Sequence, residues 1–198
     1  LPALRLRATR HYAATSGSPT FETWTTFAPI SGSVALADLN AFKLTVPDGT
    51  LHWVNGLQGD DATTLRDTAF TLQQRRLSAG ERLSLGAVGR SSEQTVPWFA
   101  VVGDSDAFYA GLLWSGAWLL NADRGASGLN LTLGLGPMST TVTAPVDGPH
   151  AFFGVTRGGL ADVSEALRNF VLRGLRSGRP FDAFVTYNPW FSYGVDID

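Results

Sequence analysis

The uncharged run AFYAGLLWSGAWLL, residues 107–120, decides the fold class of this chain. It is the longest apolar stretch in the sequence, yet it is shorter than the roughly 20 residues that a membrane-spanning helix needs. Two glycines and a serine interrupt the run, which is typical of a chain that turns between two strands. We therefore expect a buried strand pair here, Phe108–Trp114 and Ala117–Asn121.

Strand patterns continue on both sides of this run. Residues 4–8 and the first half of residues 21–27 alternate apolar and polar side chains with a period of two. Turn signals follow at short spacing, as in Ser16-Gly17-Ser18-Pro19 and Pro47-Asp48-Gly49. Further strands are expected at Phe42–Val46, Leu51–Val54, Phe70–Arg76, Trp98–Val102, Leu129–Leu135 and Met138–Thr143. Many short strands predict a mainly β domain of packed antiparallel sheets.

A helix is expected after the last of these strands. Asp162-Val163-Ser164-Glu165 fits a capping box, in which Asp162 caps a free backbone N–H and Glu165 reaches back. Gly178 and Pro180 supply the stop signal. One apolar face at helical spacing is formed by Val163, Leu167, Phe170 and Val171.

The pattern changes again after this helix. Residues 184–190 are predicted to form a strand that is reached through a helix, and no partner strands follow it. We therefore expect a β domain over residues 1–157, a linking helix over 158–180 and the opening of a second architecture over 181–198.

Composition excludes several classes of function. The net charge of −2 gives no general attraction to polyanions, so neither nucleic acid nor an anionic membrane is expected as a partner. Cysteine is absent, which removes disulfides, thiolate nucleophiles and thiolate metal ligands. No signal-peptide pattern is visible, and with the missing cysteines this favours the cytoplasm over secretion.

Few residues fit a known catalytic pattern. His11, His52 and His150 lie in unrelated segments, so we expect structural roles and no metal site. No serine lies in a Gly-x-Ser-x-Gly elbow. The stretches 86–89 and 134–136 are expected to be turns rather than phosphate cradles, because no helix starts after them. We expect no cofactor.

Paired carboxylates are the remaining candidates for acid–base chemistry. Two pairs, Asp60-Asp61 and Asp104/Asp106, lie in turn-like contexts and are interpreted as solvated loop residues. Asp196 and Asp198 are two residues apart on a strand, so their side chains share a face about 7 Å apart. That distance is close to the carboxyl separation of glycosidases, but no barrel surrounds these two residues, and we do not expect them to be the catalytic pair.

The six tryptophans divide into two groups. Core packing is expected for most of them, and Trp114 and Trp118 lie within apolar runs, which predicts burial. Trp190 differs, because it lies with Asn188 and Pro189 at a strand end, where barrel enzymes place ligand-binding groups.

Three segments carry a family resemblance. They are GRSSEQTVPWFA at residues 89–100, GLLWSGAW at 111–118 and YNPWF at 187–191. They are similar, in order and spacing, to a Gly-Arg-Ser-Ser stretch, a Trp-Ser-Gly-x-Trp hairpin and a Tyr-Asn-Ser-Trp-Glu segment of glycoside hydrolase family 36. This family contains the α-galactosidases and their relatives, and the similarity covers most of residues 20–198.

The resemblance implies an N-terminal β-supersandwich, a linking helix and the first strand of a (β/α)8 barrel that the chain does not include. It implies a retaining hydrolase of terminal α-galactosides, whose catalytic aspartates lie on later barrel strands. No residue of this chain is therefore expected to be catalytic. Trp190, which matches the family's first-strand tryptophan, and Asn188 and Asp196 are the expected substrate-binding residues.

The sequence also departs from the family pattern. Pro189 and Phe191 replace the usual Ser and Glu, and residues 55–60 lack the family's Gly-x-Trp-x-Arg-Glu loop, which in tetramers can reach a neighbour's site. Both departures bear on α-galactoside specificity and on the expected homo-oligomer.

Three interpretations of the function remain open. The chain is an inert accessory domain of a glycosidase, a carbohydrate-binding module, or an assembly domain that makes oligomer contacts. A binding module predicts several exposed, coplanar aromatic side chains on one sheet face. A scaffold predicts that most of its tryptophans are buried.

Overall fold

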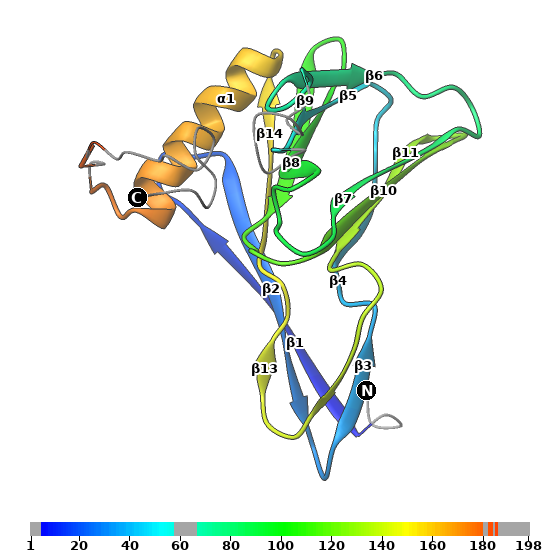
Figure 1. Ribbon diagram of the computed structural model, residues 1–198. Helices are drawn as coiled ribbons and strands as arrows, with labels where there is room; N and C mark the ends of the chain where they lie inside the picture. Colours follow the sequence, from blue (N-terminus) through cyan, green and yellow to red (C-terminus); the bar gives the residue numbers. More distant parts are fainter. Residues whose placement is uncertain (1–4, 58–66, 180–181, 184, 186–198) are drawn as a thin grey trace, which may run out of the picture.

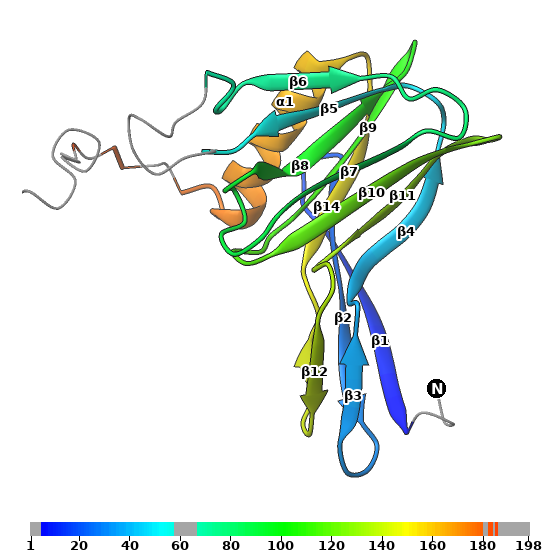
Figure 2. The ribbon, with the colours of Figure 1, turned by 45° about the vertical axis from the view of Figure 1, so that its right-hand side comes forward.

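The computed structural model describes residues 5–57, 67–179, 182, 183 and 185. Two antiparallel sheets pack face to face, and one helix lies against the outer side of the larger sheet (Figure 1). A ribbon of strands extends from one end of this sandwich (Figure 2). The predicted fold, mainly β and antiparallel with one C-terminal helix, is confirmed.

The larger sheet combines strands from both ends of the chain. Its order is β1 (Leu6–Ala14), β2 (Thr20–Pro29), β14 (Ala151–Arg157), β9 (Asp106–Leu112), β8 (Thr95–Val102), β5 (Thr50–Asn55) and β6 (Leu72–Arg75). The two-residue strand β13 (Val146–Asp147) also pairs with β2. Because β14 pairs with β2, residues more than a hundred positions apart in sequence become neighbours.

The smaller sheet has the order β4 (Asn40–Val46), β11 (Gly128–Gly134), β10 (Trp118–Gly125) and β7 (Arg82–Ala87). Its strand β11 alternates buried leucines with polar residues, as a strand with one buried face should. Leucines 129, 131 and 133 face the core, whereas Asn130 and Thr132 are only half-buried. The main core lies between the two sheets and includes Leu51, Phe99, Leu112, Leu120 and Leu131.

The apolar run at residues 107–120 contains two buried strands, as predicted, but they do not pair with each other. Strand β9 belongs to the larger sheet and β10 to the smaller one, so residues 113–117 cross from one sheet to the other. The prediction of a strand pair is therefore wrong. Both strands are apolar because each faces the shared core, and sequence pattern alone does not say which neighbour a buried strand takes.

The helix α1 (Leu160–Asn169) begins earlier than predicted. Asp162 is its third residue, and its carboxylate accepts the backbone N–H of Gly159 at 2.9 Å. Glu165 instead accepts a hydrogen bond from the Asn169 side chain at 2.9 Å. The capping role of Asp162 is real, but the residue acts from inside the first turn. The reason is the preceding Gly158, whose positive φ of 94° turns the chain directly from β14 into the helix.

The helix packs its apolar face on the outer side of the larger sheet. Val163, Ala166 and Phe170 are buried against Ala100, Tyr109 and other residues of that sheet. Val171, which we assigned to the same face, is 42% exposed because the helix widens into a π-helical segment, η2 (Phe170–Leu175). The predicted stop is confirmed at Gly178, whose φ is 75° and whose N–H bonds to the Leu172 carbonyl at 2.7 Å.

The ribbon at one end of the sandwich has a small core of its own (Figure 2). There, β3 (Val34–Ala37) pairs with β12 (Ser139–Val142) beside the far ends of β1 and β2. Leu6, Leu36 and Val142 are buried in it, with Phe27 packed against them.

The strand predictions missed three strands, β3, β7 and β14, and the two-residue β13. The error at β7 is instructive, because residues 86 and 87 were expected to form a turn. Gly86 instead lies within the strand, opposite Leu119 of β10. A Cβ at Gly86 would lie against the carbonyl oxygen of Trp118, so the glycine permits close approach of the two strands.

Candidate functional site

The predicted substrate-binding residues Trp190, Asn188 and Asp196 lie outside the described residues, as does nearly all of the expected first barrel strand. The Asp60-Asp61 pair lies outside them too. Asp104 and Asp106 are both exposed, but only Asp104 lies in the predicted turn between β8 and β9, whereas Asp106 is the first residue of β9.

Three loops meet at one end of the sandwich and form a concave surface that two of the sequence motifs reach. We call this the loop cluster, made of residues 55–57 with Phe70, residues 88–94 and residues 113–117. Backbone hydrogen bonds connect the loops: Gly56 N–H to the Gln94 carbonyl at 2.9 Å, Leu57 N–H to that of Ser92 at 3.1 Å, and Ser91 N–H to that of Ser115 at 3.2 Å. Two of the three family-like segments therefore touch here.

Side chains strengthen the same junction. The indole N–H of Trp118 donates to the Ser91 carbonyl at 2.5 Å. Gly56 passes so close to Ser92 that a Cβ would lie against the Ser92 carbonyl oxygen. These contacts explain why a glycine stands at position 56 and hold the 88–94 loop against the sandwich.

The loop cluster surrounds a pocket of about 300 Å³. Arg90 and Glu93 form an ion pair across its rim, with Nη2 and Oε2 2.6 Å apart. Three serines and two apolar residues complete the wall, which is made of Leu57, Phe70, Arg90, Ser91, Ser92, Glu93 and Ser115. Such a wall can offer hydrogen-bond donors, acceptors and apolar contact to one small polar molecule.

The tryptophans are less buried than predicted, because among the described residues only Trp118 is fully buried. Trp118 is 2% exposed, as expected, but Trp114 is 43% exposed. The apolar run that predicted burial passes through the crossing loop between the sheets, and Trp114 lies in that loop. The other described tryptophans, 24, 53 and 98, are half-buried.

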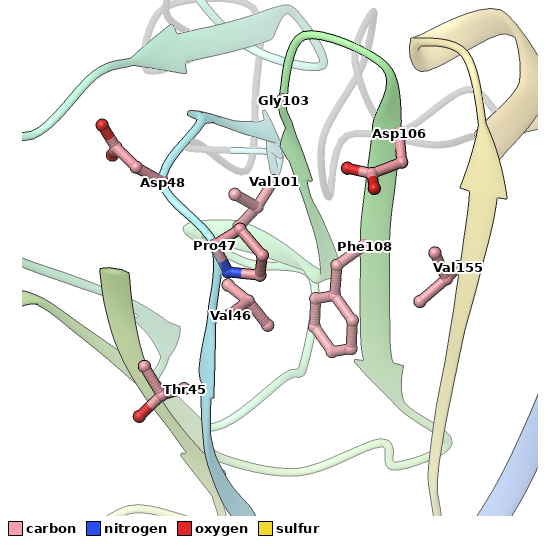
Figure 3. A pocket seen from close by; sticks show the side chains of 9 residues that line it. All are labelled: Thr45, Val46, Pro47, Asp48, Val101, Gly103, Asp106, Phe108 and Val155. Carbon is pink, nitrogen blue, oxygen red and sulfur yellow. The ribbon is translucent and has the colours of Figure 1, made fainter. Parts of the chain in front are cut away.

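A second pocket, of about 240 Å³, opens between the two sheets (Figure 3). Its wall is mostly apolar, with Phe108 and Val101 among its residues, and the Asp106 carboxylate faces it whereas that of Asp48 points away. Asp48 accepts a hydrogen bond from Arg76 at 2.9 Å and lies 3.1 Å from Nε of Arg124. The hydrogen bond from Arg76, aided by the charge of Arg124, lowers the pKa of Asp48. This carboxylate is therefore a charged structural link and a poor proton donor.

The fold brings two of the three histidines together. His11 and His150 stack on opposite faces of the Trp24 ring, with ring centroids 4.8 Å and 4.6 Å from it. Glu22 bonds to Nδ1 of His150 at 2.6 Å, and His11 Nε2 lies 2.9 Å from the Thr26 hydroxyl. The sandwiched indole separates the two imidazoles, so this group joins β1, β2 and the start of β14 and holds no metal site between the rings.

Among the described residues, no group of three or more histidine, aspartate or glutamate side chains is placed to hold a metal ion. In the same part of the chain, no helix combines the length and apolar character needed to cross a membrane.

No protein-family model and no curated protein matches the sequence, whereas solved structures do. An α-galactosidase from Lactobacillus brevis superposes with a TM-score of 0.71 at 18% identity, over 85% of this chain and 23% of its own. The GH36 α-galactosidase AgaA from Geobacillus stearothermophilus, in complex with raffinose, superposes with a TM-score of 0.70 at 17% identity. The match covers 83% of this chain and 24% of AgaA. The galactosidase domain of the α-galactosidase–sucrose kinase AgaSK superposes with a TM-score of 0.68 at 15% identity, and the match covers 84% of this chain and 24% of that one.

The chain has the fold of the N-terminal region of GH36 α-galactosidases. The resemblance that the three motifs predicted is thus confirmed at the level of the fold. The chain spans about a quarter of the length of these enzymes, at 23–24% of each.

Proposed function

We propose that this chain is the N-terminal accessory domain of a glycoside hydrolase that resembles the α-galactosidases, and that it scaffolds a catalytic barrel. The observation that carries the proposal is the fold match over 83–85% of this chain to about a quarter of full α-galactosidases. In this proposal residues 1–157 are the supersandwich, 158–180 the linking helix and 181–198 the start of the barrel.

The outer side of the larger sheet supports a scaffolding role. Helix α1 is anchored there by buried Val163, Ala166 and Phe170, so the direction in which the chain leaves the sandwich is set by packing. A helix that is anchored in this way gives the following domain a defined starting point.

The proposed substrate is a terminal α-galactoside, bound by the barrel with Trp190 in the sugar pocket and with Asn188 and Asp196 nearby. The support is the family resemblance of residues 187–191 and the fold match of the sandwich. Catalytic aspartates would then lie on later barrel strands, and this chain would need them to hydrolyse anything.

The alternative of a carbohydrate-binding sheet face has less support. Of the described tryptophans, only Trp114 is exposed by more than a third, and it comes from a loop rather than a sheet face. Homo-oligomer assembly stays open as a second role, since β1 is an edge strand with one unpaired side in the described part of the chain.

The proposal is tested by assaying the 198-residue chain on an aryl α-galactoside. We expect no turnover above the uncatalysed rate, with or without the substitution Asp196→Asn. Robust hydrolysis that Asp196→Asn abolishes would show that the chain carries its own catalytic carboxylate, and the accessory role would be wrong.

A further inference from the structure

We propose that the loop cluster is a binding site for one neutral hexopyranose unit, with Phe70 as the aromatic residue of its wall and Trp114, which precedes the wall residue Ser115, as an exposed aromatic neighbour. The site lies on this chain alone and uses none of the residues proposed for the barrel. It therefore goes beyond the scaffold function, and either proposal can fail without the other.

Trp114 precedes the pocket residue Ser115 and is the exposed tryptophan of the loop cluster. Its ring lies against Gly116, where an added Cβ would be 2.8 Å from the indole Nε1 and 3.2 Å from a ring carbon. The glycine thus lets the ring rest on the backbone of its own loop, and the side chain remains 43% exposed. Among the described residues, no hydrogen bond involves its indole N–H. A ring held in one orientation loses little entropy when a ligand packs on it.

Phe70 is the second aromatic group and stands out by its backbone. Its φ is 56°, in the left-handed region that bulky residues avoid, and its side chain is 61% exposed. Its N–H bonds to the Gly56 carbonyl at 3.2 Å, which attaches it to the loop cluster. A strained position that presents an aromatic ring to solvent gains nothing for the core, and strain of this kind gathers at ligand sites.

The polar part of the wall matches a sugar in its hydrogen-bonding capacity. Ser91, Ser92 and Ser115 line the pocket, and no hydrogen bond within the described part of the chain uses their hydroxyls. Each hydroxyl can both donate and accept, as a sugar hydroxyl can. A pyranose ring carries C–H groups on its faces and hydroxyls around its edge, so it fits aromatic groups beside hydroxyls.

The charge of the rim and the volume of the pocket further restrict the class of ligand that the site can bind. Arg90 is paired with Glu93 at 2.6 Å, so the rim carries no net charge from this pair and favours an uncharged ligand over an anionic one. The volume of about 300 Å³ lies at the lower end of ligand pockets, which typically span roughly 300–1,000 Å³. We infer that the pocket accepts one ring rather than an oligosaccharide.

The test is a titration of the isotope-labelled chain, followed by ¹H–¹⁵N spectra. The probes are methyl α-galactopyranoside, methyl α-glucopyranoside and glucuronate, each up to about 50 mM, because a single ring buries little surface and binds weakly. We expect saturable shifts at residues 90–93, 114–116 and the Trp114 indole with a neutral pyranoside, and weaker ones with glucuronate. Absence of shifts there with both neutral sugars, or equal binding of glucuronate, would overturn the proposal.

Two variants separate binding from folding. Phe70→Gly removes the ring while it relieves the positive φ, so the chain should stay folded and bind at least about tenfold more weakly. Trp114→Ala should have a similar effect, and Tyr12→Ala, an aromatic side chain that is 66% exposed on β1, should bind like the parent chain. Unchanged affinity in both Phe70→Gly and Trp114→Ala would also overturn the site.

Discussion

Individual side chains in this sandwich show that burial shifts a pKa, and that the sequence alone does not reveal which side chains become buried. His52 lies on β5 with only 9% of its surface exposed, and its Nδ1 has no hydrogen-bond partner among the described residues. Burial disfavours the charged imidazolium and lowers the pKa of His52. Nothing in the sequence distinguishes His52 from the stacked His11 and His150, because each role depends on which strands become neighbours.

The lowered pKa of His52 predicts a pH dependence of stability. The folded chain holds fewer protons than the unfolded chain at pH values between the lowered pKa and the ordinary value of 6.5. The free energy of unfolding therefore rises with pH across that window, and stability is lost as the pH falls below about 6.5. Urea unfolding from about pH 5 to about pH 7.5 measures this slope.

The matched variant is His52→Gln, which cannot titrate. The difference in unfolding free energy between the parent chain and the variant should grow in favour of the parent chain as the pH rises through the window. A difference that is constant with pH would mean that His52 is protonated alike in both states, and the effect of burial would be absent.

At the scale of elements, strands could be predicted where apolar and polar side chains alternate with a period of two. They were missed where glycine or polar residues interrupt this alternation. β4, β5 and β11 were found near their true bounds because their buried faces carry apolar side chains at alternate positions. β7 was missed because Gly86 suggests a turn. The start of α1 was misplaced because Gly158 and Gly159, rather than a side-chain cap, begin it.

Gly86 gives an element-scale prediction. Gly86→Ala should destabilise the chain by about 1–3 kcal/mol, because the new methyl group meets the backbone of β10 at Trp118. Ser84→Ala, on the exposed face of the same strand, should change stability by less than about 1 kcal/mol. Denaturant midpoints of the three proteins give the comparison. Equal midpoints for Gly86→Ala and the parent chain would mean that β7 and β10 do not approach each other this closely.

At the scale of the whole molecule, three short motifs predicted a fold that overall sequence similarity does not reveal. Structural relatives share only 15–18% identity with this chain, yet they superpose over 83–85% of it. Two of the motifs meet at the loop cluster, where Trp118 bonds to Ser91, so their residues hold a junction between loops. The pocket beside them was not predicted, because Phe70 carries no sequence signal and Trp114 lies within an apolar run.

In the proposed function, this domain holds a catalytic barrel in its active form. The most direct measurement is aryl α-galactoside hydrolysis by the polypeptide that the complete reading frame encodes, compared with the same polypeptide without residues 1–157. We expect turnover by the complete polypeptide and a loss of soluble, active enzyme when the sandwich is removed. A complete polypeptide without glycosidase activity, or a truncated one that is as soluble and as active as the complete enzyme, would contradict it.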